Sequence, residues 1–224
     1  MEGTRLRILQ HLQRDHQTVG GLAKIMELAP ATIRRHLDIL QRDRLVGFQE
    51  VRKKTGRPEY SFSLTENGQE ALPKSYDIML KMMVDEMSDL THEDVTGLDG
   101  QKLLELVFQR LSAKVANRFT GDVLPNAFGE RVFNLFGALN DEHFQPEAAN
   151  IDGKFQIKLQ NCPFRSVAMT NKAVCDFDAN MITTAMGIGM SQVACISDGQ
   201  PSCVYQSTEP LTIDLTAINS ASVQ

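Results

Sequence analysis

Four cysteines are the side chains of this sequence best suited to metal chemistry, and all four lie within residues 162–203 of a 224-residue chain. They are Cys162, Cys175, Cys195 and Cys203, with 12, 19 and 7 residues between successive members. Zinc fingers and ribbons use close pairs separated by about two to four residues, and no such pair occurs here. A disulfide framework would need an oxidising compartment, which nothing in the sequence indicates.

Two interpretations of the cysteines follow. Free cysteine is among the most often buried residue types, so the four can be small hydrophobic core residues. Their clustering in one short segment also suits ligands of an iron–sulfur cluster, because its iron atoms bind soft thiolates. Cys162 precedes Pro163, which restricts the backbone at the cysteine and helps to fix a loop. Spacing alone does not distinguish a cluster from a structural metal site.

The elements expected around the cysteines would bring their side chains together. The predicted elements are a strand at 155–159, a helix that begins near Asp176, a turn at 197–199 and a short strand that opens at Cys203. Each cysteine lies at or near an end of one of these elements. Side chains at element ends can converge although they are far apart in the sequence.

The first 45 residues show three helical patterns. The first has an apolar stripe, and the second begins after Thr18, a favourable N-cap residue. Pro30 suits the first turn of the third helix, where its missing N–H costs nothing. The residues expected to face inward are Leu6, Ile8, Leu9 and Leu12, then Leu22, Ile25 and Met26, then Ile33, Leu37 and Leu40.

The third helix is predicted to be a recognition helix in the major groove of DNA. Its outer face carries Thr32, Arg34 and Arg35 near the N-terminal end, where they can reach bases and phosphates. His36 lies nearer the inward edge, so we expect it to pack rather than to read bases.

A basic hairpin is expected directly after this helix. Residues 46–51 and 60–64 alternate as two strands, and the turn between them carries Arg52, Lys53, Lys54 and Arg57. An isolated basic turn is usually a solvated tip. Behind a recognition helix, it is better interpreted as a wing along the phosphate backbone, with affinity that falls with salt.

Residues 1–68 carry 12 Lys and Arg against 8 Asp and Glu, whereas the remainder carries 11 against 20. This asymmetry fits a DNA-binding head on an acidic body.

A long helix is predicted from Thr65 to about Leu90, with Pro73 tolerated only near its first turn or at a kink. Its apolar positions repeat at spacings of 4, 3, 4 and 3, which is typical of a dimerisation seam and equally of a core-facing stripe. The seam residues are Tyr76, Leu80, Met83, Met87 and Leu90. A winged-helix regulator generally needs two recognition helices for the two half-sites of its operator, so we favour the interpretation as a homodimer. Two further helices carry Leu103, Leu104, Val107 and Leu111, and Phe128, Val132, Phe133, Phe136 and Leu139.

The cysteine segment and the head together resemble one known family, the SufR family of iron–sulfur-responsive winged-helix repressors. The resemblance is carried by Asn161-Cys162-Pro163-Phe164, Val174-Cys175-Asp176, Cys195-Ile196-Ser197-Asp198-Gly199, Ser202-Cys203-Val204-Tyr205, Ala31-Thr32-Ile33-Arg34-Arg35-His36-Leu37 and Gly56-Arg57-Pro58. It implies a cytoplasmic homodimer that holds a [4Fe–4S] cluster through three or four of Cys162, Cys175, Cys195 and Cys203. It also implies repression of iron–sulfur assembly genes with the cluster bound, and release of DNA without it.

The sequence thus predicts an α+β fold, mainly α, in three segments. Residues 1–68 form a winged helix-turn-helix, 69–145 central dimerisation helices, and 146–224 a small α+β sensor domain with the cysteines. A related alternative is a winged-helix regulator that senses a small ligand or zinc, its cysteines being structural. We expect a cytoplasmic protein, since there is neither a long apolar run nor a signal peptide. We expect no enzyme, because GxSxG, phosphate-loop and HExxH motifs are absent from the sequence.

Overall fold

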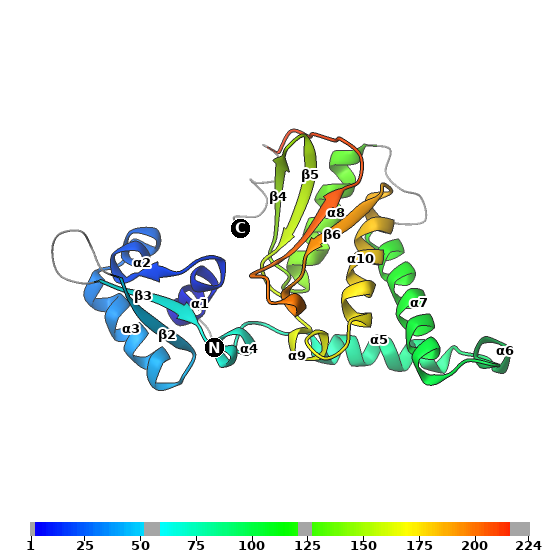
Figure 1. Cartoon of the computed structure of the whole chain (residues 1–224), viewed down its shortest axis with the longest axis horizontal. Helices are drawn as coiled ribbons and strands as arrows, with labels where there is room; N and C mark the ends of the chain where they lie inside the picture. The colour runs from blue at the N-terminus through cyan, green and yellow to red at the C-terminus, as the bar shows by residue number, and fades with distance from the viewer. Residues whose placement is uncertain (1–2, 52–58, 121–126, 216–224) are drawn as a thin grey trace. The chain divides into compact units, whose positions relative to one another are not determined.

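The computed structural model describes residues 3–51, 59–120 and 127–215, and divides the chain into two compact units, residues 1–73 and 74–224 (Figure 1). Each unit has its own hydrophobic core. The described residues combine helices with two antiparallel sheets, so the predicted mixed α+β class is confirmed.

The N-terminal unit is built from short helices around a small sheet. In chain order its elements are α1 (Thr4–Arg14), β1 (Gln17–Thr18), α2 (Val19–Met26), α3 (Pro30–Arg42), β2 (Val46–Val51), β3 (Glu59–Leu64) and α4 (Glu66–Glu70). The sheet has the order β1-β3-β2 and all its pairs are antiparallel. This is the helix, helix, recognition helix and hairpin arrangement of a winged helix.

Local signals place the helices of this unit as predicted. Thr18 caps α2 by accepting a hydrogen bond from the Gly21 N–H at 3.1 Å, and Pro30 lies in the first turn of α3. The three inward positions predicted for α3 are at most 1% exposed. The inner face predicted for α2 was wrong at one position, because Ile25 is 48% exposed and Ala23 is buried in its place.

The hairpin pairs over its full described length, from Val46 opposite Leu64 to Val51 opposite Glu59. The two-residue strand β1, which pairs with β3, has no pattern long enough to be recognised in the sequence. The turn that holds the four predicted wing cations, Arg52, Lys53, Lys54 and Arg57, lies outside the described residues.

The second unit packs helices against a four-stranded sheet. Its elements are α5 (Tyr76–Ser88), α6 (His92–Val95), α7 (Gly100–Thr120), α8 (Phe128–Asp141), β4 (Pro146–Ile151), β5 (Lys154–Leu159), α9 (Arg165–Ala168), α10 (Ala173–Met186), β6 (Met190–Ala194), the 3-10 helix η1 (Ile196–Asp198) and β7 (Cys203–Ser207). The sheet order is β4-β5-β7-β6, with every pair antiparallel. Helices α7 and α10 run side by side (Figure 1).

The β4–β5 hairpin turns through Asp152 and Gly153, which have φ angles of 52° and 74°. Two successive positive φ angles are the signature of a type I′ turn, whose twist matches that of the strands it joins, and Gly is favoured there. Alternate residues of β5, Phe155, Ile157 and Leu159, are at most 1% exposed and form the centre of the core.

The helix predicted from Thr65 to Leu90 is two helices. Thr65 caps α4, which ends at Glu70, and α5 begins only at Tyr76. Pro73 lies in the break, because a proline in a helix interior removes a backbone hydrogen bond and clashes with the preceding turn. The two later helices are present as α7 and α8, but Phe133, expected in the core, is 56% exposed.

The central helices and the cysteine segment share one core. Buried residues of α5, α7, α8 and α10 pack with those of the sheet in a single hydrophobic cluster. The structure therefore places residues 74–145 in the same compact unit as the cysteine segment, whereas the sequence analysis placed a domain boundary after residue 145. An apolar helix face can be buried against a later sheet, and such a contact leaves no local signal at the boundary.

In the described parts of the chain, helices of the length and hydrophobicity needed to cross a bilayer do not occur.

Gly68 is required by a close approach within the N-terminal unit. A Cβ at this position would lie 2.0 Å from the backbone oxygen of Leu45. We therefore expect Gly68→Ala to destabilise this unit by about 1–3 kcal/mol, because either α4 or the residue 45 backbone must move. Hydrogen exchange of the whole chain, read by mass spectrometry, should show faster exchange in residues 3–51 by roughly tenfold per 1.4 kcal/mol.

Gly47→Ala is the matched control, since its Cβ would meet only a side-chain methyl group of Thr65 at 4.0 Å. Equal exchange rates in the two variants would show that the close contact imposes no constraint.

Candidate functional site

The outer face of α3 presents the side chains that were predicted to contact DNA. Thr32, Arg34 and Arg35 are all exposed, and Arg42 continues the same face one to two turns later. Among the described ion pairs none involves these three arginines, so their guanidinium groups are available to a polyanion. His36 is half-buried, in agreement with its predicted packing role.

Two exposed aromatic residues lie beside this face. Phe48 and Tyr60 are each 49% exposed and contact edge to face, with ring centroids 5.0 Å apart. They line a groove together with Arg34 and Asp38 of α3. Tyr60 follows the period of its strand, but it pairs with Glu50, at the end of the hairpin opposite to the buried Val46.

The second candidate site gathers all four cysteines from four separate segments of the C-terminal unit. Cys162 lies in the loop after β5, Cys175 in the first turn of α10, Cys195 directly after β6 and Cys203 at the start of β7. All four are buried, with exposures of 4–7%. The Sγ of Cys195 lies 3.7 Å from that of Cys175 and 3.9 Å from that of Cys203. The predicted convergence of element ends therefore occurs, although α10 begins two residues before Cys175 rather than after it.

Burial is the main influence on three of these thiols. It raises the pKa of Cys162 to about 12 and that of Cys175 to about 11, and it raises the pKa of Cys203 still further. Cys195 differs. Burial also raises its pKa, but hydrogen bonds from the Ser197 hydroxyl and N–H, and from the neighbouring thiols, lower the pKa below its ordinary value.

Two residues of this site were not among the sequence candidates. The Oγ of Ser197 lies 3.0 Å from the Sγ of Cys195 and 3.5 Å from that of Cys175. Asp178 is 4% exposed, and it interacts electrostatically with all four cysteines. The spacing of three between Cys175 and Asp178, which places both on one helix face, was the available signal.

The loop that carries Cys162 is hydrogen-bonded to the segment where the second unit begins. Lys74 Nζ donates to the Cys162 carbonyl at 3.3 Å, and the Ser75 N–H donates to the Pro163 carbonyl at 3.2 Å. The Ser166 N–H donates to the Tyr76 hydroxyl at 3.0 Å. Three successive residues at the start of this unit are thus attached to the cysteine loop.

The donor set of the cysteine cluster is sulfur-rich. It contains four thiols and one carboxyl, and this composition suits iron–sulfur clusters or thiophilic single ions. In the described part of the chain, no three His, Cys, Asp or Glu side chains are arranged to hold a single metal ion. The fit to a cluster therefore rests on the chemistry of the donors and on their common burial.

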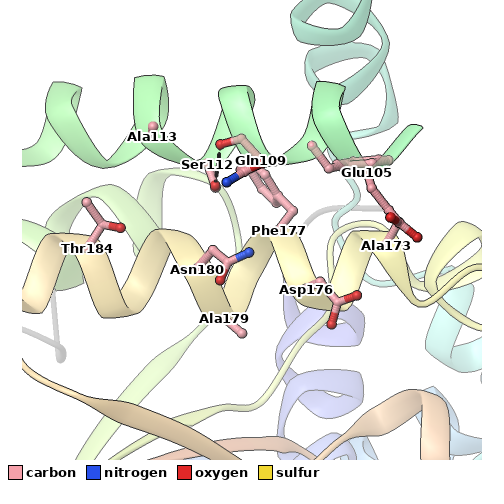
Figure 2. A pocket seen from close by; sticks show the side chains of 11 residues that line it. Glu105, Gln109, Ser112, Ala113, Ala173, Asp176, Phe177, Ala179, Asn180 and Thr184 are labelled. Atoms are coloured by element: carbon pink, nitrogen blue, oxygen red, sulfur yellow. Dashed lines mark hydrogen bonds between the residues drawn. The ribbon is translucent and has the colours of Figure 1, made fainter. Parts of the chain in front are cut away.

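A separate groove of about 620 Å³ lies between α7 and α10 (Figure 2). Its polar side chains are Glu105, Gln109 and Ser112 from α7, and Asp176, Asn180 and Thr184 from α10. Its lining includes two carboxyl groups and no cation. This groove lies along α10, the helix that carries Cys175.

Comparison with known proteins agrees with the geometry of the first site. The N-terminal unit has the winged-helix fold of DNA-binding transcriptional regulators. Residues 2–47 match the family described as bacterial regulatory protein, arsR family. No protein with a curated description matches the chain.

The crystal structure of Bacillus subtilis PadR in complex with operator DNA is similar at 14% identity, over 62% of this chain and 90% of that one. The TM-score between the two structures is 0.28.

Arg35 offers a direct test of the DNA face. Arg35→Ala should weaken binding to a duplex that the wild-type chain enriches from a random-sequence pool, because a cation facing the phosphates is removed. The slope of log affinity against log salt should become shallower by about 0.9, the contribution of one phosphate contact. Fluorescence anisotropy at several salt concentrations measures both quantities.

Lys102→Ala removes one exposed cation from α7 and is the control, with affinity and slope expected to stay at wild-type values. An unchanged slope in Arg35→Ala would place the phosphate contacts elsewhere.

Proposed function

We propose that this protein is a DNA-binding transcriptional repressor whose operator binding is switched by an iron–sulfur cluster, and that it controls genes for iron–sulfur cluster assembly. The observation that carries the proposal is the buried cysteine site, in which Cys195 contacts Cys175 and Cys203, and Cys162 interacts electrostatically with Cys175 and Cys203. This site lies in the same chain as a winged-helix domain with an exposed basic helix. The resemblance to the SufR family supports two further parts of the proposal: that the regulated genes encode iron–sulfur assembly proteins, and that the cluster-bound form is the one that represses them.

Cys162, Cys175, Cys195 and Cys203 would hold the cluster, which when bound supplies a group that is lost or altered by oxidation and iron shortage. The protein's contribution is to collect the ligands and exclude water from them. Ser197 donates to the Cys195 thiolate, and the Phe164 N–H hydrogen-bonds the Cys162 thiol. Such hydrogen bonds offset part of the cost of burying sulfur in its charged form.

The hydrogen bonds of Lys74, Ser75 and Tyr76 support a route from the cluster to the DNA-binding unit. The N-terminal unit ends at Pro73, and the next three residues begin the second unit. They are attached to the loop of Cys162. Ordering that loop biases the conformation of these three residues, and a ligand that favours one of two arrangements shifts the population between them.

A homodimer through α5 is the second part of the proposal. The five residues of the predicted seam fall into two groups. Three of them pack against the core of their own chain, namely Tyr76, Met83 and Leu90, and the other two, Leu80 and Met87, are exposed. With Val84 they form an apolar stripe at spacings of 4 and 3, with exposures of 64, 54 and 53% in chain order. A partner helix with the same stripe would cover it.

Loss of one cysteine ligand tests the cluster switch. Cys175→Ser should abolish or strongly reduce iron and sulfide uptake on anaerobic reconstitution, because a hydroxyl is a poorer ligand for iron than a thiolate. Its affinity for the enriched duplex should fall to that of the cluster-free wild type. Visible absorbance, iron and sulfide analysis and anisotropy provide the readouts.

Asn180→Ser, which places a hydroxyl at an exposed position of the same helix but on a different face from Cys175, serves as the control. Unchanged absorbance and unchanged DNA affinity in Cys175→Ser would overturn the cluster switch.

The dimer is tested at Leu80. Leu80→Glu places a charge in the proposed seam, so the variant should sediment as a monomer at concentrations where the wild type sediments as a dimer. Val193→Glu makes the same kind of change at a 55% exposed residue of β6 and should leave the dimer intact. A monomeric wild type, or a dimeric Leu80→Glu, contradicts this interface.

A further inference from the structure

Asp178 is a buried carboxyl group without the partners that buried carboxyl groups ordinarily have. The residue is 4% exposed, and its Oδ1 atom has no hydrogen-bond partner. Within the described residues, Asp178 forms no ion pair with a lysine, arginine or histidine. Burial of an unpaired carboxylate is strongly unfavourable, and buried charges are as a rule paired or bound to metals.

The position of Asp178 directs this carboxyl to the sulfurs. It follows Cys175 by three residues on α10, so the two side chains project from one face of the helix. Asp178 interacts electrostatically with Cys162, Cys175, Cys195 and Cys203, which come from four different segments. The buried carboxyl group therefore shares the cysteine face of α10 and lies within electrostatic range of the sulfurs.

A purely structural role does not account for this arrangement. An aspartate that stabilises a helix usually caps its N-terminus, whereas Asp178 is the sixth residue of α10 and is buried in its interior, as are the apolar Phe177, Met181 and Ile182. In such a core an apolar side chain of similar size would avoid the desolvation cost. The unpaired oxygen instead resembles a ligand atom whose partner is a cation.

We propose that Asp178 is an oxygen ligand of the metal centre formed by the cysteines. Each iron of a [4Fe–4S] cluster takes one protein ligand, so Asp178 would complete the set with three of the four cysteines, in place of the fourth. This inference rests on the proposed function, since it requires the cluster. When the centre forms, the carboxylic acid gives its proton to solvent, and one carboxylate oxygen donates a lone pair to an iron atom, with no change in oxidation state. A carboxylate is a harder donor than a thiolate. The iron held by Asp178 is therefore the one most readily lost, which suits a site that responds to iron supply.

The test compares Asp178→Ala and Asp178→Cys with wild-type protein after anaerobic reconstitution with ferrous iron and sulfide. Asp178→Ala should retain less iron per chain and lose iron to a ferrous chelator about tenfold faster or more. Asp178→Cys should restore the iron content, lose iron more slowly than the wild type, and show a changed electron paramagnetic resonance spectrum after reduction. Asp176→Ala, which removes an exposed carboxylate from the same helix, should match the wild type throughout.

Asp178→Asn guards against a folding artefact, because it keeps the shape of the side chain and removes its charge. Without metal, this variant should be at least as resistant to thermal unfolding as the wild type, and with metal it should show the iron loss of Asp178→Ala. Unchanged iron content and chelator rates in Asp178→Ala, even with a shifted absorption spectrum, would overturn the ligand assignment alone. A wild-type protein that takes up neither iron nor sulfide would overturn the proposed function and this inference together.

Discussion

The cost of burying ionisable groups is the constraint on which the C-terminal unit depends. Four thiols and one carboxyl group lie in its core, where burial opposes their charged forms and raises the pKa of Cys162, Cys175 and Asp178. A cation bound among them would relieve that cost, because it would pair with several negative donors at once. The apolar side chains of this core form one cluster, whereas the ionisable groups of the cysteine site are buried without a compensating positive charge among the described ion pairs. This imbalance is expected of a site that is stabilised by what it binds.

Features set by neighbouring residues were predictable from the sequence. Thr18 caps α2 and Pro30 begins α3 because both effects act within one helical turn. The inward positions of α3 and the strand at β5 followed from periods of 3.6 and 2. The convergence of the cysteines was predicted from their positions at element ends, which required only approximate boundaries.

Features set by distant contacts were not predictable. The pairing of β1 with β3 joins residues about 45 positions apart, and Ser197 reaches Cys175 across 22. The sequence around Pro73 fits either a kinked helix or the first turn of a new one. Hydrogen bonds of Ser75 and Tyr76 to residues about 90 positions later in the chain hold the start of the second helix, and the sequence does not show such contacts. Phe133 and Ile25 belong to the apolar stripes of their helices, but the packing partners cover only part of each stripe and leave these two side chains about half exposed. Asp178 was missed because its spacing of three from Cys175 points to the site only once the burial of its carboxyl group is known.

The same burial that makes the cysteine site demanding also makes it suited to control the segment next to it. The Cys162 loop is attached to residues 74–76 by three hydrogen bonds, and a typical net contribution is about 1 kcal/mol for each. That sum is comparable with the coupling free energies of ordinary allosteric proteins, about 1–3 kcal/mol. In the proposed switch, binding at the sulfurs would not need to reshape the fold to affect DNA affinity. It would need only to determine whether one loop is ordered, because that loop holds the residues that directly follow the N-terminal unit.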